Sequence, residues 1–323
     1  MVIVWRVTTS CNMGCGFCAF DSRLNRERPE ADPEHVKAFA ELLGAWGNSL
    51  NQPPMVSWMG GEPLRWPPLK ELTLVLHRKF GLRISATTNG TPLADGAMRR
   101  HIIENYEELT FSVDGIGKIH NNLRNWPDGY HWIAKHIRML VKEKTMAGAE
   151  VKLRANVVVM RDNIEYLERL CNELAGWGIE EISFNQLGGR DRPEFYATHR
   201  LLPEHAKALG ELLPRLKQTS ARQGFNICGT ESYLDRIWAT AIGRRCPVDD
   251  CRPGRFFLFI NEAGKAAPCD FTVAECGIPI DTITSVEDLA GLPQLFSNTI
   301  SEDRPPACAD CMSTQVFGKF KGL

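Results

Sequence analysis

The chain has 323 residues, of which 43% are hydrophobic and 24% are charged, a composition typical of a globular protein that buries a core. Its 38 Lys and Arg side chains nearly balance 39 Asp and Glu side chains, so no basic excess is available for binding nucleic acid. The apolar runs are too short to cross a bilayer, and the first residues do not resemble a signal peptide. We therefore expect a cytoplasmic protein that binds neither nucleic acid nor membrane.

Short apolar runs alternate with amphipathic segments over the first 187 residues or so. The sequence predicts six strands, at residues 2–7, 55–58, 82–88, 109–113, 151–159 and 181–186. Helical spacing of apolar residues predicts helices that include residues 33–46, 69–80, 131–146, 164–177 and 203–223. Repeated strand–helix units imply a parallel α/β sheet with right-handed crossovers, and six of them favour a partial (β/α)6 barrel over a closed eight-stranded one.

The chain changes character after residue 243, where cysteines, Pro and Gly accumulate around a hairpin-like segment at residues 256–268. We expect a barrel domain over residues 1–243, made of a core at 2–187 and a bridging helical segment. Residues 244–323 are then a small domain held together by metal.

Eleven cysteines are many for a reduced compartment, where clustered thiols indicate metal ligands or catalytic groups. Cys11, Cys15 and Cys18 form a C-x3-C-x2-C motif on the loop after the first strand, and Gly14 and Gly16 permit tight turns there. Three such thiolates can bind three irons of a [4Fe–4S] cluster and leave the fourth iron open to a ligand. A zinc site would need a fourth ligand close by, and none follows.

This motif, with Phe17 just before its last cysteine, resembles the cluster motif of the radical SAM superfamily. Gly60, Gly61, Glu62 and Pro63, after the second strand, are similar to the GGEP segment that holds the amino group of S-adenosylmethionine in that family. The chemistry suits this task, because paired glycines let a backbone approach closely and a carboxylate accepts hydrogen bonds from an ammonium group.

Further along the chain, the turn that contains Asn89 resembles the TNG turn of SPASM-type members. The stretch from Ser112, with His120 and Arg124, is similar to the family's SxDG…H…R stretch. The resemblance makes Asn89 a cofactor-binding residue and Ser112 a candidate for the ribose or carboxylate end of the cofactor. Arg154 is a candidate partner of the cofactor carboxylate, for which a guanidinium fork is well shaped. The alternatives are a core hydroxyl for Ser112, an ordinary strand residue for Arg154 and a structural role for His120.

Four later cysteines suggest a second metal site. Cys251 and Cys269 flank the predicted hairpin, and Cys308 and Cys311 form a CxxC pair. This arrangement resembles the twitch domain, the half-size form of the SPASM domain, which implies one auxiliary [4Fe–4S] cluster. A zinc site built from the same four cysteines and replacement of one ligand by Cys276 are the alternatives.

Cys246 lies five residues before Cys251 and directly after two arginines. A thiol facing the barrel mouth can donate a hydrogen atom to a carbon radical, so we consider Cys246 a candidate catalytic residue. The alternative is a small buried residue, which is the default for a free cysteine. We assign Cys171 and Cys228 to packing.

The resemblance implies that the reduced N-terminal cluster cleaves S-adenosylmethionine and that a 5′-deoxyadenosyl radical then abstracts a substrate hydrogen. An external one-electron donor of the flavodoxin or ferredoxin type would supply the electron. The short cysteine set and the lack of an N-terminal recognition extension favour a small substrate, and we expect a carbohydrate or aminoglycoside-like alcohol. Residues suited to binding hydroxyls and a ring are Asn185, Gln186, Arg190, Asp191, Trp126 and Trp132.

We expect an epimerase that inverts a hydroxyl-bearing carbon, with Cys246 returning the hydrogen. The alternative is a dehydrogenase that oxidises such an alcohol to a ketone and passes an electron to the auxiliary cluster. Modification of a peptide, or a metal-binding scaffold without turnover, is a weaker alternative.

Overall fold

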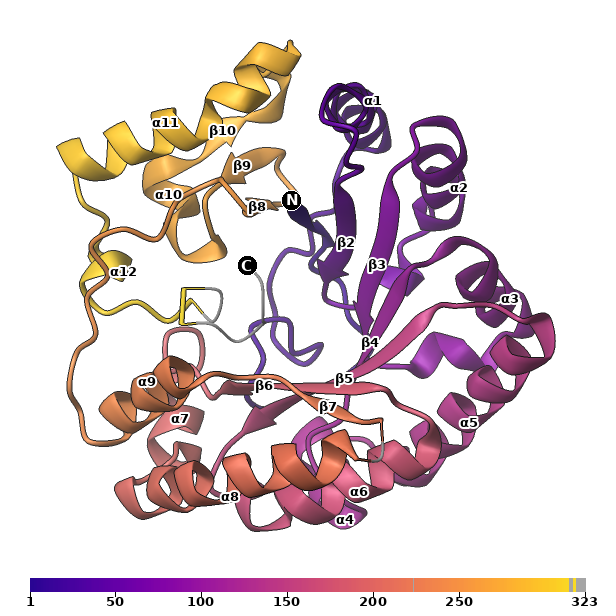
Figure 1. Ribbon diagram of the computed structural model, residues 1–323, viewed down its shortest axis with the longest axis vertical. Helices are drawn as coiled ribbons and strands as arrows, with labels where there is room; N and C mark the ends of the chain where they lie inside the picture. Colours follow the sequence, from indigo (N-terminus) through magenta and orange to yellow (C-terminus); the bar gives the residue numbers. More distant parts are fainter. Residues whose placement is uncertain (223, 314–315, 318–323) are drawn as a thin grey trace.

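Residues 1–222, 224–313 and 316–317 are described by a computed structural model, in which one curved sheet carries most of its helices on its outer side (Figure 1). The strands are β1 Val2–Thr8, β2 Met55–Gly60, β3 Arg83–Thr88, β4 Glu108–Ser112, β5 Lys152–Val159, β6 Glu181–Gln186, β7 Asn226–Ile227, β8 Phe257–Ile260, β9 Lys265–Ala267 and β10 Ile278–Pro279. The six predicted strands are β1 to β6, and every predicted end lies within two residues of the observed one.

Helices connect these strands. They are α1 Pro33–Ser49, α2 Leu69–Leu74, α3 Gly96–Asn105, α4 Lys118–Arg124, α5 Gly129–Ala147, α6 Leu167–Trp177, α7 Pro193–His199, α8 Pro203–Ala221, α9 Glu231–Ala241, α10 Val273–Cys276, α11 Val286–Glu302 and α12 Pro306–Ala309. Within the described residues, no helix is long and apolar enough to span a membrane.

The strand order is β10-β9-β8-β1-β2-β3-β4-β5-β6-β7. From β1 to β7 every neighbouring pair is parallel, and at least one helix lies between successive strands. The sheet is open, since β7 and β10 form its two edges. The predicted α/β fold with a partial barrel is therefore confirmed.

The two faces of the sheet differ in polarity. Along β5, buried Leu153 and Val157 alternate with half-buried Arg154 and Asn156. The buried set belongs to the main hydrophobic core together with apolar residues of the surrounding helices. The other face is polar and turns toward the concave side of the sheet, which leaves that side available for a site.

The C-terminal region extends the same sheet. β8 pairs in parallel with β1, from Val2 opposite Phe257 to Trp5 opposite Ile260. β9 then folds back antiparallel to β8, which confirms the predicted hairpin, and β10 pairs with β9. The domain boundary near residue 243 stays a prediction, because shared strand pairing joins the two regions.

Several helices were not predicted from the sequence. The buried face of α3 includes Arg99, His101 and Asn105, and these polar residues weaken its apolar periodicity. α11 lies in the region where few periodic segments were expected, yet it buries Leu289 and Phe296 and contains Pro293 within the helix. In both helices tertiary packing outweighs the local signal.

The pairing of β8 with β1 predicts that both regions unfold together. Ile260→Ala removes a fully buried side chain and should lower the free energy of unfolding of the whole chain by about 2–5 kcal/mol. Leu295→Ala, at a position 48% exposed on α11, is the matched control and should change it by about 0.5 kcal/mol or less. Denaturant unfolding followed by circular dichroism and tryptophan fluorescence measures this, and two separate transitions would contradict it.

Candidate active site

The sequence motifs meet at one edge of the sheet. β1 leads into the loop that carries Cys11, Cys15 and Cys18, while β2 ends at Gly60 and β4 ends at Ser112. In a parallel sheet the carboxyl ends of the strands lie on the same edge, where ligands are commonly bound. The fold therefore brings together candidate residues that are far apart in the sequence.

The glycine pair after β2 packs directly on the cysteine loop. Gly60 has φ +150°, and a Cβ atom there would lie 2.1 Å from the carbonyl oxygen of Thr8. A Cβ atom on Gly61 would lie 2.1 Å from the carbonyl oxygen of Ser10. The Gly61 amide donates to the Thr8 carbonyl at 2.8 Å, and the Glu62 amide donates to the Ser10 carbonyl at 2.9 Å. Only glycine permits this close approach.

The carboxylate of Glu62 lies beneath this contact and is fully buried. It accepts hydrogen bonds from the amide of Asn89 at 2.6 Å, the hydroxyl of Thr88 at 2.8 Å and the amide of Leu64 at 3.1 Å. Burial raises the pKa of Glu62 to about 7, against the opposing effect of these bonds. Glu62 thus joins the ends of β2 and β3, and its predicted contact with an amino group of S-adenosylmethionine stays a prediction, as does the role of Pro63.

Asn89 joins the turn after β3 to the cysteine loop. Its side-chain nitrogen Nδ2 donates to the side-chain oxygen of Asn12 at 3.0 Å and lies 3.8 Å from the Cys11 sulfur. Its side-chain oxygen accepts a hydrogen bond from the Thr91 amide at 2.9 Å. Sequence reasoning selected Asn89 but missed Asn12, which occupies a variable position of the cysteine motif, and Thr91, which follows the turn that contains Asn89.

A buried ion pair between Asp114 and Arg124 packs against the cysteine loop. Arg124 on α4 donates from Nε to the Asp114 carboxylate at 2.6 Å, and that carboxylate also accepts from the Val158 amide at 2.7 Å. The Arg124 guanidinium carbon lies 5.4 Å from the centre of the Phe17 ring, and its Nη1 lies 4.0 Å from the Cys15 sulfur. A permanent positive charge therefore faces the thiol group, which favours its anionic form.

His120 belongs to the same network. It is fully buried, its Nδ1 accepts a hydrogen bond from the Asp114 amide at 3.3 Å, and its ring packs near Trp126 and Tyr130. Burial lowers the pKa of His120 to about 3, so it is neutral at ordinary pH. These contacts indicate a structural role.

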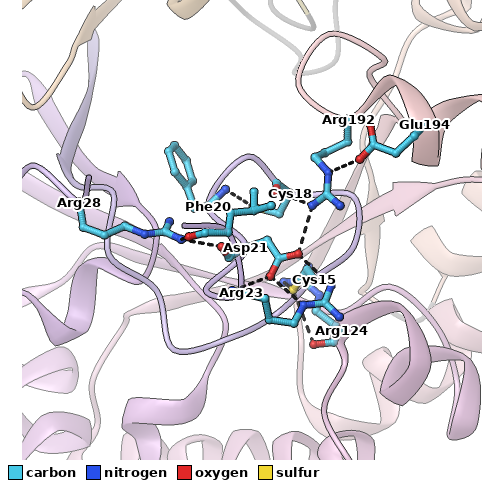
Figure 2. A network of polar contacts seen from close by, with 10 residues as sticks. Cys15, Cys18, Phe20, Asp21, Arg23, Arg28, Arg124, Arg192 and Glu194 are labelled. Carbon is cyan, nitrogen blue, oxygen red and sulfur yellow. Dashed lines mark hydrogen bonds and ion pairs between the residues drawn. The ribbon is translucent and has the colours of Figure 1, made fainter. Parts of the chain in front are cut away.

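Asp21 anchors the far end of the cysteine loop (Figure 2). Its carboxylate accepts from Arg23 through Nε at 2.9 Å and Nη2 at 2.8 Å, and from Arg192 at 3.1 Å. Its backbone carbonyl accepts from Arg28 at 2.6 Å. These arginines hold the pKa of Asp21 well below its usual range. Since Arg192 lies after β6, this contact ties the loop after β6 to the loop after β1.

The surroundings of the three sulfurs fit an iron–sulfur cluster. The amide of Phe20 donates to the Cys18 sulfur at 3.3 Å, as N–H groups do around cluster thiolates. Burial raises the pKa of Cys15 to about 12 and also raises the pKa of Cys11 and Cys18. Bound iron would replace these protons with positive charge, so cysteines 11, 15 and 18 are the residues that would hold the cluster.

Arg154 has a different place from the one expected. It is the third residue of β5, near the amino ends of the strands, and forms ion pairs with Glu108 at 2.9 Å and Glu181 at 2.6 Å. Because these carboxylates already bind the guanidinium group away from the site edge, we no longer assign Arg154 to the cofactor. Ser112 does end β4 at the site edge, and its cofactor contact stays a prediction.

The four C-terminal cysteines also come together. Cys251, Cys269, Cys308 and Cys311 line one cavity of about 650 Å³. Burial is the main cause that raises the pKa of Cys251 to about 11 and of Cys269 to about 12. Across the described residues no three Cys, His, Asp or Glu side chains are grouped around a single metal ion. These four cysteines are the residues that would hold an auxiliary cluster, which stays a prediction, as does the zinc alternative.

Cys246 lies beside this second site. Its amide donates to the Asp310 carboxylate at 3.0 Å, and its carbonyl accepts from the Cys311 amide at 3.0 Å. Neither Cys246 nor Cys276 is among the described residues that line the cavity. Cys276 is instead buried on α10, and Cys171 and Cys228 are buried as well.

The residues expected to bind substrate divide into two groups. Trp126 and Trp132 have ring centres 5.1 Å apart and pack against the main core, so they belong to helix packing. Asn185 and Gln186 end β6 at the site edge, and the loop beyond them carries Arg190, whose guanidinium carbon lies 4.7 Å from the Phe271 ring centre. Asp191 lies 3.8 Å from the Arg190 side chain.

The close approach of Gly61 to the cysteine loop predicts that a larger residue there reduces iron binding without unfolding the chain. Gly61→Ala should displace the cysteine loop and reduce the iron bound after anaerobic reconstitution, while circular dichroism shows the fold retained. Gly210→Ala is the matched control, since nothing lies within 4 Å of a Cβ atom there, and it should bind iron like the unaltered chain. Equal iron content in both variants would contradict the role of Gly61.

Glu62 predicts a pH dependence of the metal-free protein. Its folded pKa of about 7 exceeds the ordinary 4.5, so between these values the folded state binds more protons than the unfolded state. Stability from this group is full below the ordinary pKa and falls by about 3 kcal/mol as pH rises through the window. Denaturant unfolding across this range should show a shallower fall in Glu62→Gln, and identical profiles would refute the assignment.

Comparison with known proteins agrees with the site. The radical SAM superfamily model matches residues 5–174. An AdoMet-dependent heme synthase of Methanosarcina barkeri is 25% identical over 285 residues, 84% of this chain and 76% of that protein. An Fe-coproporphyrin III synthase of the same organism is 24% identical over 225 residues, 69% of this chain and 53% of that protein.

Solved structures share the fold. The structure of anSMEcpe with bound AdoMet aligns with a TM-score of 0.67 at 18% identity, over 94% of this chain and 80% of that one. At this identity the likeness concerns the fold alone. The family match covers more than half of the chain and includes the cysteine loop, the glycine pair and the Asp114–Arg124 pair. The chain therefore belongs to the radical SAM superfamily.

Proposed function

We propose that this radical SAM enzyme oxidises its substrate and passes an electron to a second iron–sulfur cluster held by the C-terminal cysteines. One observation carries the proposal, namely that Cys251, Cys269, Cys308 and Cys311 line a single cavity. Four cysteine ligands would close that cluster to substrate, which suits it for electron transfer.

The proposed oxidation removes one hydrogen atom and then one electron from the substrate. When bound, the N-terminal cluster and S-adenosylmethionine together supply abstraction of one hydrogen atom from a substrate carbon. The substrate then becomes a stable product by losing one further electron, together with a proton or with CO2 from a neighbouring carboxylate. The second cluster accepts that electron. Where a proton is lost it passes to water, whereas loss of CO2 from an ionised carboxylate releases no proton. An external one-electron donor supplies the reducing electron for the first step.

The chain's own residues prepare the first step. The glycine pair lets the backbone after β2 approach the cysteine loop closely. Asn89 and Arg124 place hydrogen-bond donors beside the sulfurs of Cys11 and Cys15. Asp21 holds the end of the loop that carries the three cysteines, through hydrogen bonds from Arg23 and Arg192.

We propose an iron tetrapyrrole with carboxylate side chains as the substrate class. The names of both relatives point to such molecules. Arg190 supports this choice, because its guanidinium carbon lies 4.7 Å from the ring centre of Phe271. Arg6, whose guanidinium carbon lies 5.3 Å from the ring centre of Phe259, already forms an ion pair with Glu262. The positive charges of Arg190 and Arg6 both oppose the rise in the pKa of Asp270 that burial causes, and Asp270 directly follows Cys269 in the chain. Cationic and aromatic groups together suit a flat, anionic ring.

The epimerase with Cys246 as hydrogen donor is the second candidate. It requires the Cys246 thiol to reach the substrate carbon, whereas the backbone of Cys246 is bound to Asp310 and Cys311. The relatives' names also favour tetrapyrroles over carbohydrates. Epimerisation of a sugar therefore stays a prediction that the same experiment can test.

Anaerobic turnover in D2O distinguishes these functions. The reconstituted chain, dithionite and S-adenosylmethionine are offered iron coproporphyrin III and, separately, a panel of sugars and aminoglycosides. We expect loss of hydrogen, with or without CO2, from the tetrapyrrole. Cys269→Ser should still form 5′-deoxyadenosine but little product, while Cys246→Ala should retain product formation. A sugar of unchanged composition that gains one deuterium, and does so only with Cys246 present, would establish the epimerase instead.

A further inference from the structure

Arg236 is a buried arginine that neither the sequence motifs nor the reaction above uses. It lies on α9, its side chain is 1% exposed, and one of its terminal nitrogens, Nη2, contacts the Asp310 carboxylate at 3.0 Å. The same nitrogen lies 2.6 Å from the Met312 sulfur. Asp310 stands between Cys308 and Cys311, so Arg236 is tied to the segment that carries two of the four cavity cysteines.

Two nitrogens of Arg236, which carry three N–H groups, have no hydrogen-bond partner among the described residues. Its Nε and Nη1 are buried, and neither makes a hydrogen bond to any group in the described part of the chain. A guanidinium group stays charged in a protein, so burying its donors unpaired costs free energy. This cost is offset when an anion lies beside the donors. Asp310 supplies one negative charge, and it also accepts a hydrogen bond from the Cys246 amide.

The nearest anion that the site can acquire is the cluster itself. Arg236 contacts the carboxylate of Asp310, the residue directly before Cys311, at 3.0 Å, so its positive charge lies next to the segment that carries Cys308 and Cys311. Four thiolates around an iron–sulfur core carry net negative charge, and one-electron reduction adds one more negative charge without breaking a bond. A nearby cation stabilises the reduced form more than the oxidised form.

We propose that Arg236 is a positioning residue of the second cluster: anchored by Asp310, it holds the CxxC segment and makes the cluster easier to reduce. This inference rests on the proposed function, in which that cluster accepts an electron from the substrate. The electron comes from the substrate carbon radical, the cluster is reduced by one electron, and where the substrate loses a proton it goes to water.

The test uses the full chain with Cys11, Cys15 and Cys18 changed to Ala, so that iron at the second site is measured alone. Iron content is determined after anaerobic reconstitution, and the midpoint potential is measured by dithionite titration followed by electron paramagnetic resonance. Arg236→Gln removes the charge, and Arg236→Lys keeps the charge but loses the planar fork. Arg99→Gln is the matched control, because Arg99 is also a buried arginine in an ion pair, with Glu143 at 2.8 Å.

We expect the midpoint potential to be highest in the parent, lower in Arg236→Lys and lowest in Arg236→Gln, with Arg99→Gln equal to the parent. If Arg236→Gln fails to fold, Arg236→Met decides, because it also removes the charge but leaves an apolar side chain of similar length in the buried position. A lower potential in Arg236→Met supports the proposal and an unchanged one overturns it. Equal potentials in Arg236→Gln and Arg99→Gln would also overturn it, while the second cluster itself would stand. A parent that binds no iron would overturn the second cluster and this inference together.

Discussion

The buried ion pair between Asp114 and Arg124 is the constraint on which the cysteine loop depends. Asp114 follows β4 and accepts a hydrogen bond from the Val158 amide in β5, while Arg124 reaches from α4 toward the Cys15 sulfur. Burying two charges is costly unless both are fully bonded, and here backbone and side chain together satisfy the carboxylate. The pair thus sets the position of the loop relative to the sheet, and with it the place of the first cluster.

The two cysteine sites have the same arrangement of charges. Each has a buried arginine held by an aspartate, Arg124 by Asp114 and Arg236 by Asp310. Arginine suits this task better than lysine, because its charge persists in a buried environment and its planar fork offers several donors. In the metal-free protein burial raises the pKa of the thiols, so each arginine provides positive charge where thiolates must form.

β1 connects the two sites. Its carboxyl end leads into the first cysteine loop, and along its length it pairs with β8, whose hairpin leads to Cys269. A sheet is stiff in comparison with a linker, so the separation of the two sites is set by strand pairing. In the function that we propose, an electron leaves the substrate for the second site, and a fixed distance between the two sites would favour that transfer.

Much of this protein follows from local sequence. Alternating strands and helices predicted β1 to β6 and the partial barrel, since residue periodicity reports directly on burial. The spacing of Cys11, Cys15 and Cys18 indicated the first site, because three thiols so close in sequence can bind one cluster. The glycine pair supported it, because paired glycines let two backbone segments approach closely. The sequence also grouped the four later cysteines that line one cavity.

Only the tertiary structure decided which acidic side chain pairs with each arginine. Arg154 was a reasonable cofactor ligand by residue type, yet neighbouring strands give it Glu108 and Glu181, whereas Arg236 lies far from every motif in the sequence and reaches Asp310. Ion pairs form between residues brought together by strand register and helix packing, so their partners are not encoded by spacing along the chain. The sequence by itself determined the fold class and indicated the candidate ligands, and the packing of distant elements determined the charges around them.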